Sequence, residues 1–228
     1  MTIRIKRAIG LVLFGWTAAW PAAFGGTITG IVAAKGPPAA LEGPAGGGYK
    51  SRRYKFAERV DYEHLQDFVV YIDQSMGETK PGSVATITQR DVSFEPHVLP
   101  IVVGSVIRWP NADEIFHNVF SMSEVHSFQL GNYLKEQVPN VRFDRVGQVD
   151  VFCSIHSKMH CIILVLPCPY FAKVDANRRY TITGVPAGTY RLKAWQERMP
   201  PQTRSVTVPA DGEVQVDFTL GFAELPKY

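Results

Sequence analysis

The sequence has few cysteines and lacks the motifs on which most cofactor-dependent and hydrolytic enzymes rely. Three cysteines occur in 228 residues, and none belongs to a Cys-x-x-Cys-His segment, so covalently attached haem is not indicated. Neither glycine-rich motif that cradles phosphates in nucleotide-binding proteins is present. No carboxylate pair stands in a defined motif, and no nucleophile has a base placed for it. These absences predict a protein that is not an enzyme.

The N-terminus has a charged start followed by an apolar stretch that is short for a membrane span. Arg4, Lys6 and Arg7 precede apolar residues 8–20, and small residues then surround a cleavage point. This pattern predicts a secretory signal peptide over residues 1–25 of a periplasmic or otherwise exported protein. Because the apolar stretch is shorter than a typical span, an uncleaved membrane anchor is the lesser alternative.

Once the predicted signal peptide is removed, the chain has no excess of positive or of negative charge. Residues 1–25 contain three of the 24 Lys and Arg residues and none of the 21 Asp and Glu residues, so 21 of each sign remain. A balanced chain gives no reason to expect binding to nucleic acid or to an anionic membrane surface. Contact with a membrane is expected only through an uncleaved signal anchor.

Sustained helical periodicity is also absent, whereas β-strand signals recur along the chain. Short runs rich in β-branched and aromatic residues are separated by Gly, Pro, Asn or Asp, as in β-sandwiches. The sequence therefore predicts an all-β fold. The predicted strands are 27–32, 68–72, 84–88, 98–103, 106–109, 119–121, 141–143, 149–153, 162–166, 180–183, 190–195, 205–208 and 214–220.

One segment offers metal ligands at close spacing. Cys153, His156 and Met159 stand three residues apart, in a loop between two predicted strands, and His117 lies on another strand. A tight loop can turn its three side chains toward one point, which His117 then reaches from outside the loop. One thiolate, two imidazoles and a weak axial thioether form a site that both Cu(I) and Cu(II) tolerate. The predicted ligands of a single copper ion are therefore His117, Cys153, His156 and Met159.

Taken singly, these residues have simpler explanations. A cysteine before an apolar run is often a small core residue, and an isolated histidine is more often an ordinary surface or core group. The spacing of the whole set favours copper. Two other functions stay open, namely copper delivery or buffering without electron transfer, and a structural or binding protein with a vestigial site.

The segment 92–111 and the His117-Asn118 pair resemble the front half of a plastocyanin-like cupredoxin. The short Cys-x-x-His-x-x-Met loop is similar to that of amicyanin. Periplasmic plastocyanin-like proteins often labelled methylamine utilisation proteins share this loop, the His-Asn-Val-Phe-Ser run and the Phe-x-Leu-Gly-x-Tyr stretch at 128–133. The resemblance covers about 84–220 and implies a Greek-key β-sandwich with a type 1 (blue) copper site. Cys161 departs from the pattern, because a small residue is usual there.

The same resemblance implies roles for the site residues. Copper would pass electrons between redox partners such as a cytochrome or a dehydrogenase. His156 is expected to be the port at the surface, His117 to lie deeper, and Met159 to tune the potential as the axial ligand. Asn118 is expected to tether the Cys153 loop by a hydrogen bond at Ser154.

A second resemblance lies near the C-terminus. Residues 175–195 contain Gly-Val-Pro-x-Gly-x-Tyr and resemble the carboxypeptidase regulatory-like, or transthyretin-like, β-sandwich. That family begins with strands like 26–32 and 68–72, which here precede the copper segment. We therefore expect the copper domain to be nested inside a small transthyretin-like sandwich, with two consecutive domains as the alternative. The expected parts are a signal peptide at 1–25, N-terminal strands with a mobile Gly/Pro-rich loop at 26–75, a cupredoxin domain at 76–166, the rest of the second sandwich at 167–222 and a tail at 223–228.

The strand at 161–166 is apolar at every position, which predicts cover on both of its faces. Cys161 and Cys168 are predicted to be buried free thiols unless the strand breaks at Pro167. Seven extended residues span about 23 Å, whereas disulfide-bonded Cα atoms lie about 5.5 Å apart. The side chains predicted not to be metal ligands are His64, His97, Met122, His126 and His160, of which His97 and His126 are expected to be solvated in loop or edge contexts.

Overall fold

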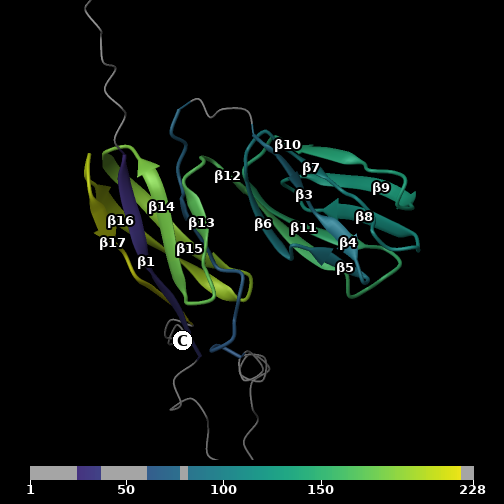
Figure 1. Cartoon of the computed structure of the whole chain (residues 1–228), viewed down its shortest axis with the longest axis horizontal. Helices are drawn as coiled ribbons and strands as arrows, with labels where there is room; N and C mark the ends of the chain where they lie inside the picture. Colours follow the sequence, from purple (N-terminus) through teal and green to yellow (C-terminus); the bar gives the residue numbers. More distant parts are fainter. Residues whose placement is uncertain (1–24, 37–60, 78–81, 222–228) are drawn as a thin grey trace, which may run out of the picture.

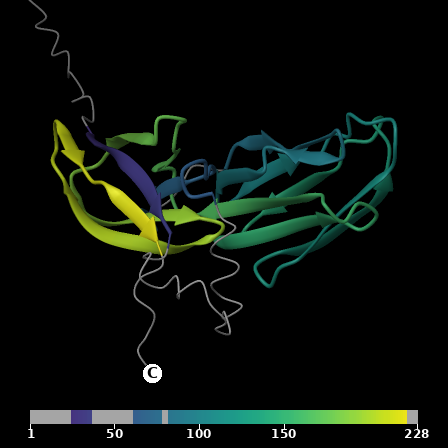
Figure 2. The same ribbon diagram turned by 90° about the horizontal axis from the view of Figure 1, so that it is seen from below.

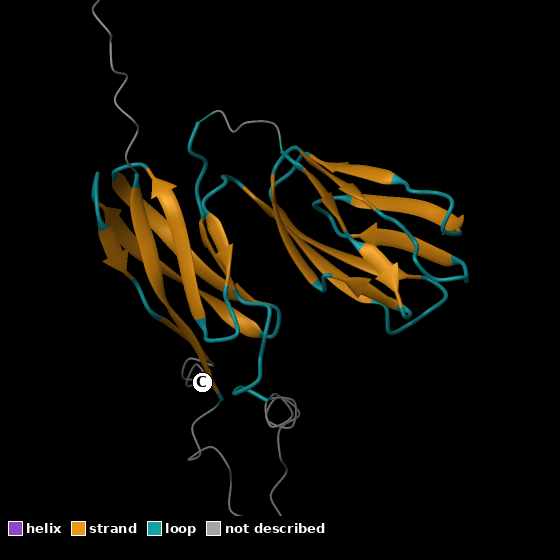
Figure 3. Cartoon of the chain, in the orientation of Figure 1, coloured by secondary structure: helices purple, strands orange, loops and turns teal. Residues whose placement is uncertain are grey.

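The described part of the chain is built from β-strands joined by loops and turns (Figure 3). The computed structural model describes residues 25–36, 61–77 and 82–221. Within these ranges it contains eighteen strands and no helix, so the all-β prediction is confirmed. No described helix is therefore long and apolar enough to cross a membrane. Most of the predicted signal peptide and of the Gly/Pro-rich loop, and all of the tail, lie outside the described residues.

Strands from both ends of the sequence build one sandwich, here called the terminal sandwich. Its strands are β1 (Gly26–Lys35), β2 (Val69–Ile72), β13 (Phe171–Lys173), β14 (Arg179–Val185), β15 (Gly188–Gln196), β16 (Met199–Val208), β17 (Glu213–Gln215) and β18 (Phe218–Gly221). One sheet has the order β14-β1-β17, with β18 also paired to β1, and the other has the order β13-β2-β15-β16. Early and late strands thus share both sheets, which occupy one side of the molecule in Figure 1.

The segment between them forms sheets of its own, here called the central sandwich. Its strands are β3 (Val84–Thr86), β4 (Thr88–Arg90), β5 (Ser93–Glu95), β6 (Val98–Val102), β7 (Ser105–Arg108), β8 (His117–Met122), β9 (Ser127–Tyr133), β10 (Asn140–Phe143), β11 (Gly147–Cys153) and β12 (His160–Leu166). A five-stranded sheet has the order β6-β12-β11-β8-β9, a three-stranded sheet has the order β10-β7-β3, and β4 and β5 form a hairpin. Ile107, Phe143 and Val151 from these sheets share one buried core.

Strand β12 is buried along most of its length because both of its faces are covered. Its odd-numbered residues from Cys161 to Val165 join the core of the central sandwich. Its even-numbered residues from Ile162 to Leu166 join another cluster, together with Val69 of β2 and Trp195 of β15. This cluster, the inter-sandwich contact, is where the two lobes of Figure 2 adjoin. The predicted cover on both faces of this strand is confirmed.

Leu164→Ala is expected to lower the free energy of unfolding by about 2–5 kcal/mol, the usual cost of truncating a buried leucine. Leu164 is 4% exposed within the inter-sandwich contact, so the change leaves a cavity between the two sandwiches. Denaturant unfolding measures the loss. The matched control is Val84→Ala, because Val84 is 65% exposed and its truncation should change stability by less than about 0.5 kcal/mol. Equal effects of the two changes would contradict the packing described for β12.

Cys161 and Cys168 are free and buried, as predicted. Burial raises the pKa of both thiols. The sulfur of Cys168 lies 3.4 Å from the carbonyl oxygen of Ile72, to which it donates. Both thiols therefore behave as small core groups and leave Cys153 as the cysteine with metal-binding neighbours.

Candidate metal centre

Two adjacent strands bring His117 and Cys153 to the same face of the five-stranded sheet. His117 is the first residue of β8, and Cys153 is the last residue of β11. Cys153 pairs with Val119 across these antiparallel strands, two residues from His117. Since side chains alternate along a strand, residues two apart project from the same face. His117 and Cys153 therefore point into one space, and both are buried.

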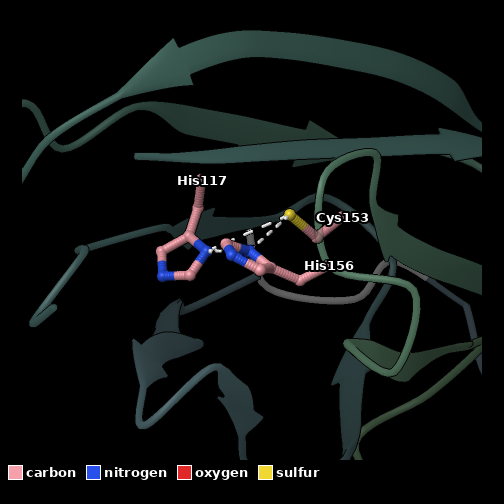
Figure 4. A group of neighbouring side chains, drawn as sticks. All are labelled: His117, Cys153 and His156. Carbon is pink, nitrogen blue, oxygen red and sulfur yellow. Dashed lines mark hydrogen bonds between the residues drawn. The ribbon is translucent and has the colours of Figure 1, made fainter. Parts of the chain in front are cut away.

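The loop after Cys153 returns His156 to this space. The amide of Met159 donates to the carbonyl of His156 over 3.0 Å, and the amide of Cys153 donates to the carbonyl of Met159 over 3.3 Å. These bonds close a tight turn between the end of β11 and the start of β12. His156 lies inside that turn, half-buried, with its ring beside that of His117 (Figure 4).

Three donor atoms converge where these elements meet. The Nδ1 atoms of His117 and His156 are 3.1 Å apart, and the sulfur of Cys153 lies 4.0 Å and 3.6 Å from them, respectively. An ion bound in a trigonal plane, about 2.0–2.1 Å from nitrogen and about 2.3 Å from sulfur, separates its donors by roughly 3.5–3.8 Å. The observed separations bracket this range, so small side-chain adjustments allow all three donors to share one ion.

The donor chemistry suits copper. A thiolate is a soft ligand that favours Cu(I), and imidazole binds Cu(II) well. His117 is fully buried and Cys153 is 5% exposed, so two of the three donors are shielded from solvent. Met159 is also buried and belongs to the same core cluster as Cys153. Copper bound between these residues would be held by two nitrogens and a thiolate, with the thioether of Met159 nearby in the fold.

Asp113 orients His117 and was not predicted from the sequence. Its carboxylate lies 2.8 Å from Nε2 of His117, so that this nitrogen donates to Asp113 and leaves Nδ1 free to face Cys153. Metal-binding histidines are commonly held this way through their second nitrogen. Burial raises the pKa of Asp113, but hydrogen bonds from His117 and from the amides of Val92 and Asp91 outweigh it and hold the pKa below its usual range. Asp113 is thus a carboxylate at neutral pH.

Asp113→Asn is expected to weaken Cu(II) binding about 10- to 100-fold, the usual effect of losing a group that orients a metal ligand. The amide removes the negative charge beside His117 and can present its NH₂ group to Nε2. A competition titration against a chelator measures the change. The matched control, Asp144→Asn, alters an exposed carboxylate paired with Arg142 and should leave the affinity unchanged. Equal affinities for the two variants would show that Asp113 does not position His117.

The predicted tether between Asn118 and Ser154 is not formed among the described residues. Asn118 is buried at the second position of β8, and its Oδ1 atom has no hydrogen-bond partner there. Ser154 is exposed on the Cys153 loop. The loop is held instead by the backbone bonds of Cys153 and Met159 described above. Local backbone bonding replaces the side-chain tether that the family resemblance implied.

The other histidines lie away from the three converging donors. His64 is exposed beside Asp61, and His126 packs against Phe143 with ring centroids 4.8 Å apart, where burial lowers its pKa. His97 was predicted to be solvated in a loop or at an edge. It is instead half-buried and bonded on both ring nitrogens, because the loop before β6 packs against the terminal sandwich.

Comparisons with known proteins cover only parts of the chain. No curated protein matches it. Residues 168–216, within the terminal sandwich, match the family model described as polysaccharide lyase family 4, domain II. Among solved structures, a purple cupredoxin from Nitrosopumilus maritimus is 22% identical with a TM-score of 0.33, over 36% of this chain and 98% of that chain. An oxidised amicyanin variant is 23% identical with a TM-score of 0.34, over 36% of this chain and 80% of that chain. A reduced amicyanin variant is 21% identical with a TM-score of 0.34, over 42% of this chain and 97% of that chain.

Proposed function

We propose that this chain is an exported type 1 copper protein that carries single electrons between redox partners and is not itself an enzyme. The convergence of donor atoms from the buried His117 and Cys153 and the half-buried His156 carries the proposal. Bound copper would supply a one-electron Cu(I)/Cu(II) couple. Two strands and one tight loop already hold the ligands together. The ligands would therefore move little when copper changes between Cu(I) and Cu(II). A small rearrangement favours fast electron transfer.

The ligands differ in how close they lie to the surface. His117 is fully buried behind Asp113, whereas His156 is half-buried. We therefore propose His156 as the port through which electrons enter and leave, with Met159 as the axial ligand. Three exposed apolar side chains flank the two histidines along the chain, namely Ile115, Phe116 and Ile155. Such an apolar rim would let a partner protein approach closely and exclude water.

Ile155→Glu is expected to slow electron self-exchange between oxidised and reduced copper protein at least about 10-fold, because each rim then carries a negative charge that opposes encounter. NMR line broadening in mixtures of the two forms measures the rate. Val84→Glu is the matched control, since it adds the same charge to an exposed apolar position in β3. An unchanged rate in Ile155→Glu, or equal slowing in the control, would place the port elsewhere.

The terminal sandwich would serve as a binding or docking module, as its resemblance to carboxypeptidase regulatory-like domains implies. The terminal sandwich contacts β12, the strand that follows the loop of Cys153 and His156. The proposal requires redox partners, such as a cytochrome or a dehydrogenase. The charged start and apolar stretch within residues 1–25 support export of the protein.

A further inference from the structure

A second cluster of metal-binding groups lies where the two sandwiches meet. His97 stands just before β6, His160 is the first residue of β12, and Glu197 lies in the turn between β15 and β16. Nε2 of His97 is 2.9 Å from one carboxylate oxygen of Glu197, and Nδ1 of His160 is 3.9 Å from the other. The central sandwich thus supplies two imidazoles, and the terminal sandwich supplies a carboxylate.

Both imidazoles are held through the ring nitrogen that does not face Glu197. Nδ1 of His97 lies 3.1 Å from the backbone carbonyl oxygen of His160, and Nε2 of His160 lies 3.2 Å from the carboxylate of Asp150. Each of these nitrogens has an acceptor in front of it, to which it can donate while the opposite ring nitrogen binds an ion. The opposite nitrogens, Nε2 of His97 and Nδ1 of His160, are the two that face Glu197. Metal-binding histidines show this same arrangement.

Without a cation, Nε2 of His97 can donate to Glu197 over 2.9 Å, but Nδ1 of His160 has no such contact with it. The 3.9 Å between Nδ1 of His160 and the Glu197 oxygen is too long for a hydrogen bond. Two donor atoms that each lie about 2.1 Å from one ion are at most about 4.2 Å apart. Both histidine–glutamate separations fall below this limit, and all three ligand atoms lie within 4.8 Å of one another, so small side-chain adjustments allow one ion to bridge Glu197 to both rings.

We propose that His97, His160 and Glu197 form a second metal site, which takes a divalent transition-metal ion of the Zn²⁺ type. Two imidazoles and one carboxylate are a ligand set that Zn²⁺ accepts, and three protein ligands leave a position open to water or another ligand. The side chains are 39%, 25% and 28% exposed, respectively, so the ion can enter from solvent. Because its ligands come from both sandwiches, the bound ion would fix the inter-sandwich contact. This site lacks sulfur and is separate from the proposed copper centre.

The test uses a full-length chain carrying Cys153→Ala and His156→Ala, which removes two donors of the first centre. Calorimetric titration with Zn²⁺ is expected to show one site per chain. Adding Glu197→Gln should weaken that binding at least 100-fold, whereas Glu136→Gln, at an exposed carboxylate, should not change it. Zn²⁺ should also raise the melting temperature of the parent protein, and not that of the Glu197→Gln variant.

Two outcomes would overturn the second site. One is the absence of Zn²⁺ uptake by the parent protein, which would leave His97 and Glu197 as a simple ion pair. The other is uptake that Glu197→Gln and His97→Asn both leave unchanged. Melting temperatures measured without metal show whether each variant remains folded. Since the first centre is disabled throughout, failure here leaves the proposed electron-transfer function unaffected.

Discussion

Cys153→Ala is expected to abolish the intense visible absorption of the Cu(II) protein and to weaken copper binding at least 100-fold. The absorption of a type 1 site arises from charge transfer between the thiolate and copper, and Cys153 is the only cysteine within reach of both His117 and His156. Its loss leaves two imidazoles and a buried thioether, which do not produce that band. Absorption spectroscopy and a chelator competition measure the two effects.

Cys161→Ala is the matched control for this prediction. Cys161 is also buried and free, but it packs in the core of the central sandwich and is not part of the group of donor atoms formed by His117, Cys153 and His156. Burial raises the pKa of its thiol, so it does not supply a thiolate. The control should keep both the band and the affinity. Retention of the band in Cys153→Ala, or its loss in Cys161→Ala, would refute the assignment of the sulfur ligand.

Trp109→Ala is expected to lower the free energy of unfolding by about 3–5 kcal/mol, the cost of removing a large buried aromatic side chain. Trp109 is fully buried after β7 and packs against Phe94 and Phe128, with ring centroids 6.0 Å and 5.9 Å away. Its carbonyl oxygen also accepts a hydrogen bond from Tyr133. The cavity would lie beneath the chain that leads to Asp113 and His117, so copper affinity should fall as well.

Trp109→Phe separates the packing of this residue from its polar atom. The indole Nε1 atom has no hydrogen-bond partner among the described residues, so losing it leaves no new group unsatisfied. Phenylalanine keeps much of the buried aromatic surface and should cost less than half as much as alanine. Equal destabilisation by the two changes, in denaturant unfolding, would contradict the packing account.

Most strands were predictable because their side chains alternate or are wholly apolar. Strand β9 was missed, since it is an edge strand with mainly exposed or half-buried residues and contains Gly131 at a φ of 73°. The short strands β5 and β13 were also missed, and the predicted strand 214–220 is divided into β17 and β18. Edge strands and short strands bury few side chains, so the sequence does not show a clear strand pattern for them.

The converging donors were predictable from the spacing of Cys153 and His156 in one loop, together with His117. The groups that orient the donors were not. Asp113 reaches His117 from a loop whose path depends on the fold around Trp109. Glu197 reaches His97 across a separation of one hundred residues. Such pairs are set by tertiary packing, which local sequence patterns do not record.

Gly30 illustrates the same limit in the terminal sandwich. In the sequence it only interrupts a run of β-branched residues. In the fold, a Cβ atom there would lie 2.0 Å from the carbonyl oxygen of Val216, in the segment between β17 and β18. The close approach exists only because late strands run parallel to β1. Glycine is therefore required by a contact that spans most of the chain.

Spectroelectrochemical titration of the full chain, loaded with one equivalent of Cu(II), tests the central claim most directly. The account predicts one intense thiolate-to-copper band that disappears on uptake of one electron per chain and returns fully on reoxidation. Oxidative and reductive titrations should coincide, because the buried His117 and Cys153 and the half-buried His156 keep the ion in both states. A colourless Cu(II) form, or loss of copper on each reduction, would contradict electron transfer by this protein and favour a role in copper handling.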